Sequence, residues 1–525
     1  MRKEALCLLN PILVAIFPVL FLYSENLHLV QPIETIKPLL IGISVGLGVY
    51  LLPRLLFINK EQASAYACVL LLFFFSYSNI YYLAQSIVAD IRHRFVLLPW
   101  LFVVFISLLL VTAFRKKIEK FNGFLRTAFT FLILFQFYQI YSKNNLNNKL
   151  PNQKMLSYLT AQEIKLDQNS NKIISKPKRD MYLLILDGYT GQKALKEYYN
   201  FNNKQFYLEL ANRNFSTNQK SFCNYPHTIY SLTSTLNLRY VDSAVVGSVI
   251  KDYPNLINQL NHNFVFKFLK KQGYQIEFIS PNEWPTNHVQ TADKVLLTSK
   301  DKEDFFYRSY INTAFSLLTM HGVNLGNQEN IRFTDKYIKN RLTSVPTAFK
   351  LTAAKNDSQK PIFRFVHILS PHDPATFKPD GSPQEKNIPE RQGYLDDLKY
   401  INKKTIECID QILENYKNKL QPIILIQSDH GWELKHWKPR FDDRYKQCRG
   451  NIINLSYLPG LENKKNIQEL TPVNTFRFIF NEYFNTDFKY LKNKIYHVNF
   501  EKRGKLEDIT EFIYGNWKNT KVHGN

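Results

Sequence analysis

Cysteine is scarce in this 525-residue chain, and acidic residues are outnumbered by basic ones. The five cysteines form no Cys-x-x-Cys pair, so a thiolate metal site is not indicated. Cys223, Cys408 and Cys448 lie in the polar part of the chain, and their spacing leaves open whether a disulfide forms. The sequence also contains no internal repeat.

The shortage of acidic residues, 44 against 67 Lys and Arg, gives a formal net charge of +23. Such an excess can hold a domain against anionic lipid or favour an anionic substrate, and it equally fits a general Lys/Asn/Ile-rich bias of composition. The basic residues are dispersed and no binding motif accompanies them, which argues against nucleic-acid binding. The sequence predicts no protein partner.

Apolar residues dominate residues 1–141. A helix needs about 20 predominantly apolar residues to cross a bilayer. The first apolar segment is not a cleavable signal peptide, because it is too long, lacks a small-x-small cleavage site and is followed by further spans. We predict an all-α transmembrane domain over 1–141 with five helices, at Ala5–Tyr23, Ile36–Leu52, Ala63–Leu83, Phe95–Phe114 and Phe124–Tyr141.

Positive charge predicts the orientation of these spans. Eight Lys and Arg would be cytoplasmic if the N-terminus is inside, against three on the opposite side. Five spans then place everything after Tyr141 outside the cytoplasm, in a multi-pass protein of the cell membrane. The alternative is that Ile36–Leu52, with its Pro38 and three glycines, is re-entrant, which would reverse the side of the large domain.

Residues 142–178 are polar and show no clear period, which predicts a linker. Over 179–525, continuous apolar runs alternate with helical patterns. The runs predict strands at Met181–Leu186, Tyr274–Ile279, Pro361–Ile368 and Ile423–Gln427, and the helical patterns lie at Leu256–Lys271, Asp335–Lys350, Tyr394–Tyr416 and Asn474–Tyr483. This alternation predicts an α/β domain with a mostly parallel central sheet and helices on both faces.

Polar residues gather where the predicted strands end, which is where ligands bind on such sheets. Asp187 follows the first strand, and Asp429 and His430 follow the last, offering a hard oxygen and an imidazole to a metal. His367 and His372 lie at the end of the third predicted strand. Each of these pieces alone is more often a turn or a structural residue, but together they are specific.

Thr228 lies where a loop enters a predicted helix, within the sequence Asn-Tyr-Pro-His-Thr-Ile-Tyr-Ser-Leu-Thr-Ser at 224–234. A hydroxyl near a helix N-terminus sits in positive potential, which favours an alkoxide and a bound phosphate or sulfate. For a lone threonine, a helix cap is the usual interpretation. His436 adds a further polar side chain downstream of the Asp-His pair.

Together, these motifs resemble the alkaline phosphatase superfamily, in particular its sulfatase-like membrane branch, which includes lipoteichoic acid synthases and phosphoethanolamine transferases. The resemblance covers roughly Asp180 to Tyr496. It implies one divalent metal ion, zinc or manganese, held by Asp187, Thr228, Asp429 and His430. It also implies that substrate is bound, or the leaving group protonated, by His367, His372 and His436.

The nucleophile depends on how the motif is aligned. The family pattern Thr-x-x-Ser-x-x-Ser-x-Leu places it on Thr228. Matching Pro226 to the Cys-x-Pro-Ser-Arg of true sulfatases would place it on Asn224, which cannot do the chemistry, and Cys223 is the runner-up. The absence of Cys-x-Pro-Ser-Arg argues against formylglycine chemistry.

The resemblance implies a membrane-anchored transferase or hydrolase that acts on an envelope lipid or glycan phosphodiester through a Thr nucleophile. Its partners would be a membrane lipid donor and an envelope glycan or lipid acceptor. The alternatives are a sulfate-ester or phosphodiester hydrolase of the same superfamily, or a non-catalytic protein that binds an anionic glycan. A transporter fits poorly, because the five spans lack an inverted repeat and a central charged pair.

Overall fold

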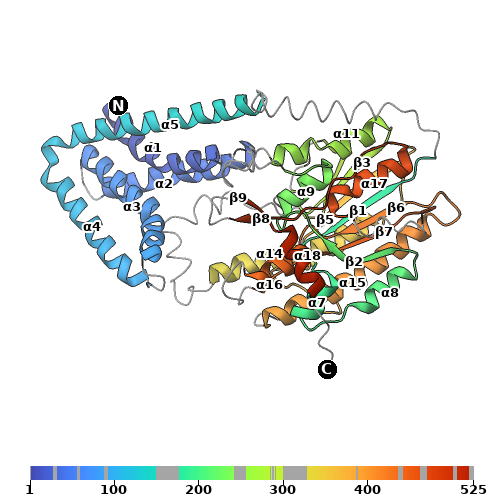
Figure 1. Cartoon of the computed structure of the whole chain (residues 1–525). Helices are drawn as coiled ribbons and strands as arrows, with labels where there is room; N and C mark the ends of the chain where they lie inside the picture. Colours follow the sequence, from blue (N-terminus) through green and yellow to red (C-terminus); the bar gives the residue numbers. More distant parts are fainter. Residues whose placement is uncertain are drawn as a thin grey trace. The chain divides into compact units, whose positions relative to one another are not determined.

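The computed structural model contains two compact units, one built mainly from the N-terminal helices and one from most of the chain after residue 176 (Figure 1). Part of the predicted linker, residues 149–176, lies outside the described residues. The structure describes residues 2–25, 27, 32–55, 59–87, 91, 93–148, 177–241, 256–283, 285–286, 289, 291–299, 328–385, 388–434, 442–461, 470–499 and 505–519.

Five helices of the first unit are long and apolar enough to cross a membrane, by length and composition. The segment considered for re-entry is one continuous helix of 20 residues. The fifth helix continues past Tyr141 because no Gly or Pro interrupts the chain there before Pro151. The helices are α1 (Arg2–Glu25), α2 (Ile36–Leu55), α3 (Lys60–Ile87), α4 (His93–Ala113) and α5 (Ile118–Asn148).

Small and neutral polar residues join these helices. A Cβ added to Gly46 of α2 would lie 2.9 Å from the Pro11 carbonyl oxygen of α1, so only glycine permits this close approach. The Ser24 hydroxyl of α1 donates a 2.6 Å hydrogen bond to Oε1 of Gln136 in α5. Both side chains are almost fully buried, and pairing them avoids the cost of an unsatisfied polar group.

The second unit is built on a seven-stranded sheet in the order β2-β7-β6-β1-β5-β3-β4. β1 pairs in parallel with both β5 and β6, and β3 pairs in parallel with β5 and β4. β7 runs antiparallel to its neighbours β6 and β2. The strands are β1 (Met181–Leu186), β2 (Ser216–Phe222), β3 (Gln275–Ser280), β4 (Lys294–Leu297), β5 (Ile362–Ile368), β6 (Ile423–Gln427) and β7 (Asn451–Tyr457).

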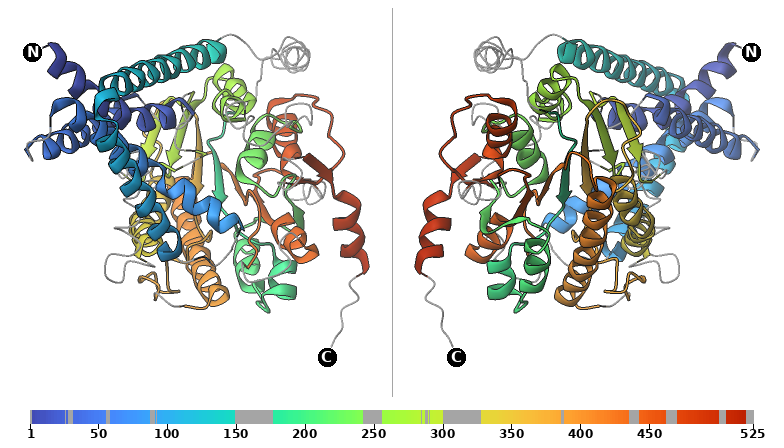
Figure 2. Two further views of the ribbon diagram at one scale, coloured as in Figure 1. Left: turned by 90° about the vertical axis from the view of Figure 1, so that its left-hand side faces the viewer. Right: turned by 90° about the vertical axis from the view of Figure 1, so that its right-hand side faces the viewer.

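Helices cover both faces of this sheet (Figures 1 and 2). The remaining elements are a hairpin of two short strands and a C-terminal helix. The helices and hairpin strands are α7 (Gln192–Tyr198), α8 (Lys204–Ala211), α9 (Thr228–Leu236), α11 (Phe264–Lys271), α14 (Gln328–Thr352), α15 (Glu390–Asn415), α16 (Asp443–Gly450), α17 (Pro472–Phe484), β8 (Tyr496–Asn499), β9 (Lys505–Asp508) and α18 (Thr510–Asn519).

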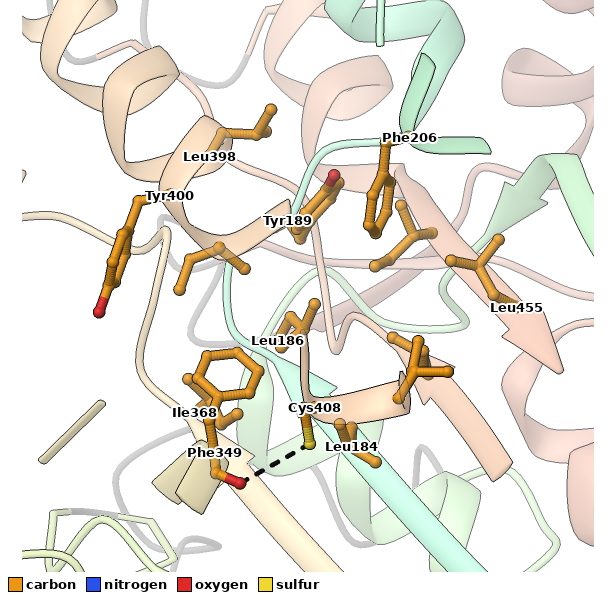
Figure 3. Packing of buried hydrophobic residues seen from close by; sticks show 14 of the residues in the cluster. Leu184, Leu186, Tyr189, Phe206, Phe349, Ile368, Leu398, Tyr400, Cys408 and Leu455 are labelled. Carbon is orange, nitrogen blue, oxygen red and sulfur yellow. Dashed lines mark hydrogen bonds between the residues drawn. The ribbon is translucent and has the colours of Figure 1, made fainter. Parts of the chain in front are cut away.

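Alternate strand residues build two separate cores, because successive side chains point to opposite faces of a sheet. On one face, Leu184 and Leu186 of β1 and Ile368 of β5 pack with residues of α8, α14 and α15 (Figure 3). On the other face, the ring of Phe363 of β5 lies 5.9 Å from that of Phe476 in α17. Burying each of these side chains contributes about 1.5–3 kcal/mol.

The predicted fold class is confirmed, and the four predicted strands begin and end within one residue of those observed. The helical stretch predicted at 256–271 is broken near Asn263, because the Oδ1 of this residue accepts a 2.9 Å hydrogen bond from the Phe266 amide and caps a new helix. Strand β2 was not predicted, because its sequence Ser-Thr-Asn-Gln-Lys-Ser-Phe carries almost no apolar signal.

Candidate active site

The candidate site lies at the carboxyl ends of three adjacent parallel strands. β1 occupies the centre of the sheet, and its neighbours β5 and β6 come from later, separate parts of the chain. Asp187 directly follows β1, His367 is the penultimate residue of β5, and Asp429 lies two residues after β6. Ligands on α/β sheets bind where strands from separate crossovers meet in this way.

Strand alternation directs these side chains to one face of the sheet. Leu184 and Leu186 point to the α15 side, so Asp187 points to the side that carries α9 and α17. His367 alternates with Ile368 and points to that same side. There α9 begins with Thr228, whose Oγ1 lies 3.3 Å from Nε2 of His430.

Asp187, Asp429 and His430 form a buried cluster. One ligand atom from each lies within 4.8 Å of the others, and none of the three is more than 5% exposed. Oδ1 of Asp187 and Oδ2 of Asp429 are buried without a hydrogen-bond partner. Two buried carboxylates that each leave one oxygen without a donor are costly unless a cation lies between them, so these residues fit a divalent metal ion.

His430 presents a lone pair to this cluster. Its Nδ1 lies 2.8 Å from the Gly431 carbonyl oxygen, so Nδ1 carries the hydrogen and donates it. Nε2 is left to face Asp187, Asp429 and Thr228. Burial, helped by the positive charge of Arg449, lowers the pKa of His430 to about 3, which keeps the imidazole in the neutral form that binds metals.

The two carboxyls differ in their surroundings. Burial by itself would raise the pKa of Asp187, but His372, His367 and His430 hold that pKa well below its usual range. Burial and the charge of Asp187 raise the pKa of Asp429 to about 6. The repulsion between the two carboxyls is the interaction that a bound cation removes.

Two glycines bring the Asp187 and Asp429-His430 segments together. Gly188 has φ +71°, its amide donates a 3.2 Å hydrogen bond to Oδ1 of Asp429, and an added Cβ would lie 3.3 Å from Cα of His372. An added Cβ on Gly431 would lie only 2.0 Å from the Cys448 carbonyl oxygen. Backbone therefore packs against backbone on both sides of the cluster, which no other residue type permits.

His367 is fully buried beneath Asp187. Its Nε2 lies 3.3 Å from Oδ2 of Asp187, although the alignment is too poor for a full hydrogen bond, and its Nδ1 lies 2.7 Å from Oγ1 of Thr286. The ring can accept the Thr286 hydroxyl at Nδ1 and turn an N–H on Nε2 towards Asp187. The predicted contact of His367 with substrate stays a prediction, and this placement favours support of Asp187.

His372 is partly exposed beside the cluster. Its ring lies 4.6 Å from that of Trp432 and 6.2 Å from that of His430. Nδ1 lies 2.8 Å from the Asp373 carbonyl oxygen, so Nδ1 donates and Nε2 is left as the acceptor. His372 thus lies beside the buried cluster, and its predicted contact with substrate stays a prediction. His436 lies outside the described residues.

A family model described as Sulfatase matches residues 191–478, more than half of the chain. The chain belongs to the sulfatase family. The resemblance to the alkaline phosphatase superfamily that the motifs predict is therefore confirmed. The matched range contains Thr228, His367, His372 and the Asp-His pair, while Asp187 lies four residues before it. No curated protein matches the sequence.

Several solved structures are similar to this sulfatase-family chain. The C-terminal periplasmic domain of EcEptC from Escherichia coli is 14% identical, covers 66% of this chain and 96% of its own, and has a TM-score of 0.42. The phosphoethanolamine transferase EptA from Neisseria meningitidis is 14% identical, with coverages of 86% and 88% and a TM-score of 0.31. The lipoteichoic acid synthase LtaP from Listeria monocytogenes is 13% identical, with coverages of 57% and 72% and a TM-score of 0.32. These likenesses do not identify an activity for this chain.

The two other nucleophile positions considered for this family member are buried in structural roles. Cys223 is fully buried, its thiol donates to the Arg449 carbonyl oxygen at 3.4 Å, and burial raises its pKa. The Asn224 side chain donates 2.9 and 2.8 Å hydrogen bonds to Thr471 and to the Lys494 carbonyl oxygen, and accepts one from the Val473 amide. All five cysteines of the chain are free and buried.

Arg449 is a site-supporting residue that the sequence analysis missed. Its Nε and Nη2 donate hydrogen bonds of 2.9 and 2.7 Å to the Pro226 carbonyl oxygen, two residues before Thr228. Its Nη1 pairs with Oε2 of Glu433 at 2.8 Å, and both side chains are largely buried. No local pattern marks this arginine, because its partners lie 223 and 16 residues away in sequence.

Proposed function

We propose that this protein is a membrane-anchored, metal-dependent enzyme that transfers or hydrolyses a phosphoryl group of an envelope lipid or glycan phosphodiester, with Thr228 as the nucleophile. The observation that supports it best is the Thr228 hydroxyl, 3.3 Å from His430 at the mouth of a buried cluster with two unpartnered carboxylate oxygens. A hydroxyl beside a metal-binding cluster is the arrangement that nucleophilic catalysis on a phosphoester requires.

One divalent ion, zinc or manganese, would be held by oxygens of Asp187 and Asp429, by Nε2 of His430 and by Oγ1 of Thr228. When bound, it lowers the pKa of the threonine hydroxyl and neutralises negative charge on the transferring group. These donors combine hard oxygens with one imidazole, which suits both metals.

Thr228 Oγ1, having released its proton to solvent, would attack phosphorus, and the bond between phosphorus and the leaving alcohol oxygen would break. His372, which lies beside the cluster, would take up a proton from solvent on Nε2 and donate it to that oxygen, while Nδ1 keeps its bond to Asp373. An alcohol of the acceptor, or water, would then displace Thr228 and regenerate the free hydroxyl. Thr228 is the first residue of α9, so backbone amides of this nine-residue helix favour the phosphate oxygens throughout.

His367 and Arg449 would act on this reaction through other residues. The ring of His367 fixes Asp187 from below, and the guanidinium of Arg449 fixes the chain two residues before Thr228. Correct placement of a nucleophile to within a fraction of an ångström controls rate strongly. We therefore assign both as positioning residues.

The five apolar helices make this a membrane protein, and the charge asymmetry of its loops supports a cytoplasmic N-terminus with the catalytic unit outside. A lipid donor at the bilayer surface suits an enzyme anchored there. The acceptor would be an envelope glycan or lipid, or water in a hydrolase.

The test uses full-length protein purified in mild detergent. Metal content is measured by mass spectrometry, and turnover is followed with bis(4-nitrophenyl) phosphate and with 4-nitrophenyl sulfate. The variants are Thr228→Ala, Thr228→Ser and Cys223→Ala. We expect bound metal, turnover of the phosphodiester, loss of at least about 10³-fold in Thr228→Ala, partial activity in Thr228→Ser and full activity in Cys223→Ala.

Three outcomes would contradict the proposal. Preferred turnover of the sulfate ester would favour a sulfate-ester hydrolase. Full activity in Thr228→Ala would exclude this nucleophile. A protein that binds an anionic glycan but turns over neither ester would be the non-catalytic alternative.

A further inference from the structure

A cavity of about 420 Å³ lies within the first unit, between α3, α4 and the start of α5. Its walls are almost wholly apolar and include Phe73 of α3, Leu110 of α4 and Phe121 of α5. The one hydroxyl in the wall, Ser107, already donates a 2.8 Å hydrogen bond to the Val103 carbonyl oxygen. The interior therefore offers contact to an apolar chain and no polar group that needs a ligand.

One end of the cavity is positively charged. Lys117 forms part of the wall there, within the short helix η2 (Arg115–Lys117) that joins α4 to α5. Arg115, Lys116 and Lys120 flank it, and all four side chains are exposed. Within the part of the chain that the structure describes, none of these four forms an ion pair. A cluster of unpaired cations at the end of a membrane helix favours an anionic group at the level of the lipid headgroups.

The cavity is also open to the surroundings of the helices. Leu110 is 50% exposed and Phe114 56% exposed, although both contribute to the cavity wall. α4 as a whole is the least covered of the five helices, with only 11% of its most apolar stretch buried. In a membrane, the side chains at this opening face acyl chains rather than water.

We propose that this cavity is a binding site for an anionic glycerophospholipid. One acyl chain lies between α3 and α4, and the headgroup phosphate pairs with Lys117. The volume lies within the range of ordinary ligand sites, and the only charge in the wall is at one end, which matches a slender apolar chain with an anionic head. The site rests on the first unit alone, so it is independent of the catalytic proposal.

The proposed orientation places this turn at the cytoplasmic leaflet, on the opposite side of the membrane from the catalytic unit. The bound lipid is therefore a resident of the helix bundle and not the donor substrate. The bound lipid would fill the cavity between α3 and α4 and hold the turn before α5 at the membrane surface.

The experiment measures lipid retained by full-length protein in nanodiscs of 1:1 palmitoyl-oleoyl phosphatidylglycerol and phosphatidylcholine. After transfer to mild detergent, native mass spectrometry counts each lipid on the protein. Lys117→Ala is compared with Lys120→Ala, which removes another exposed cation, at the start of α5, that is not part of the cavity wall. We expect retained phosphatidylglycerol to fall about fivefold in Lys117→Ala and to change little in Lys120→Ala.

A second pair of variants tests the acyl-chain part of the site. Leu110→Trp fills the cavity, whereas Leu109→Trp adds the same ring at a neighbouring exposed position of α4 outside the wall. We expect bound lipid to fall in the first and to persist in the second. Circular dichroism and gel filtration check that every variant keeps its helices and remains monodisperse.

The proposal is overturned by any of three results. Equal losses in Lys117→Ala and Lys120→Ala would mean diffuse attraction to the membrane surface. Equal retention of the two lipids would mean that the cations do not select the headgroup. Unchanged binding in Leu110→Trp would mean that the acyl chain lies elsewhere. If a tryptophan variant does not fold, the lysine pair still decides the headgroup contact.

Discussion

Buried polar side chains serve different ends in the two units of this protein. In the helices they are neutral, and some are bonded to one another, as Ser24 is to Gln136 and Asn10 to Ser64. At the ends of the strands they are carboxylates and imidazoles, and Asp187 and Asp429 keep oxygen atoms without partners. Neutral pairs cost little to bury, whereas unpaired carboxylates cost much. The unpartnered oxygens of these two carboxylates therefore identify the candidate active site.

The largest expected effect is the loss of the metal-binding cluster in Asp429→Asn. We expect activity to fall about 10³-fold, because a bound metal supplies several kcal/mol of charge stabilisation. Burial raises the pKa of Asp429 in the folded state to about 6, above its unfolded value, so in metal-free protein the cost of ionising this group builds up from about pH 4 to pH 6 and is fully present above pH 6. We therefore expect metal-free Asp429→Asn to unfold at the same or a higher temperature than metal-free wild type at pH 7.5.

Calorimetry with and without a chelator checks this expectation. Added metal should stabilise wild type and leave Asp429→Asn unchanged. Asp410→Asn, which alters an exposed carboxyl paired with Arg213, is the control for charge removal alone. A large loss of stability in metal-free Asp429→Asn would show that this carboxylate stabilises the fold. It would contradict our inference that burying this carboxylate without a metal lowers stability.

Gly431→Ala should cost more than about 3 kcal/mol of unfolding free energy, because the added Cβ would lie 2.0 Å from the Cys448 carbonyl oxygen. Gly515→Ala is the matched control, since an added Cβ there has no neighbour within 4 Å and the residue lies inside α18. Denaturant unfolding measures both. Equal stability of the two variants would mean that the backbone contact at Gly431 can relax.

His367→Gln should weaken metal binding about 10- to 100-fold, which is the usual cost of removing a group that orients a metal ligand. The measurement is a competition titration against a fluorescent chelator. Thr286→Val removes only the hydroxyl that faces Nδ1 of His367, so a smaller loss is expected. Unchanged metal affinity combined with a raised KM in His367→Gln would instead support the predicted contact with substrate.

Arg449→Lys should lower kcat about tenfold with little change in KM, because a lysine cannot make both bonds to the Pro226 carbonyl oxygen and also pair with Glu433. Arg449→Ala should lower kcat further, since the buried Glu433 then loses its partner. Steady-state kinetics separate the two constants. A change confined to KM would mean that Arg449 contacts the substrate.

The smallest expected effect is in the helices. Gln136→Leu removes one acceptor from Ser24, but the Ser24 hydroxyl keeps its 2.9 Å bond to the Phe21 carbonyl oxygen. We expect a loss of about 0.6 kcal/mol, typical of hydrogen bonds between membrane helices, measured by denaturation in mixed micelles. A loss of several kcal/mol would mean that breaking this neutral pair costs as much as leaving a buried charged group of the second unit without its partner.

Much of the architecture could be predicted from local patterns. The apolar stretches predict five helices, and the runs at Met181–Leu186 and Ile423–Gln427 predict two central strands at their observed boundaries. The polar strand β2 and the break at Asn263 were missed, because pairing with β7 and a side-chain cap decided them. Local pattern has little weight where a hydrogen bond to a distant strand or a cap decides the structure.

The sequence by itself determined the membrane helices, the parallel sheet and the motif residues, because hydrophobic periodicity and the Asp-His-Gly signature are local properties of the chain. Only the tertiary structure decided that Asp187 and Asp429 leave oxygens unpartnered, that His367 lies beneath Asp187 and that Arg449 fixes the chain before Thr228. These contacts join residues up to about 240 positions apart, as the bond from the Gly188 amide to Asp429 does with a separation of 241. Such pairs are set by strand order and by which face each strand residue occupies, and neither is encoded by any short stretch of sequence.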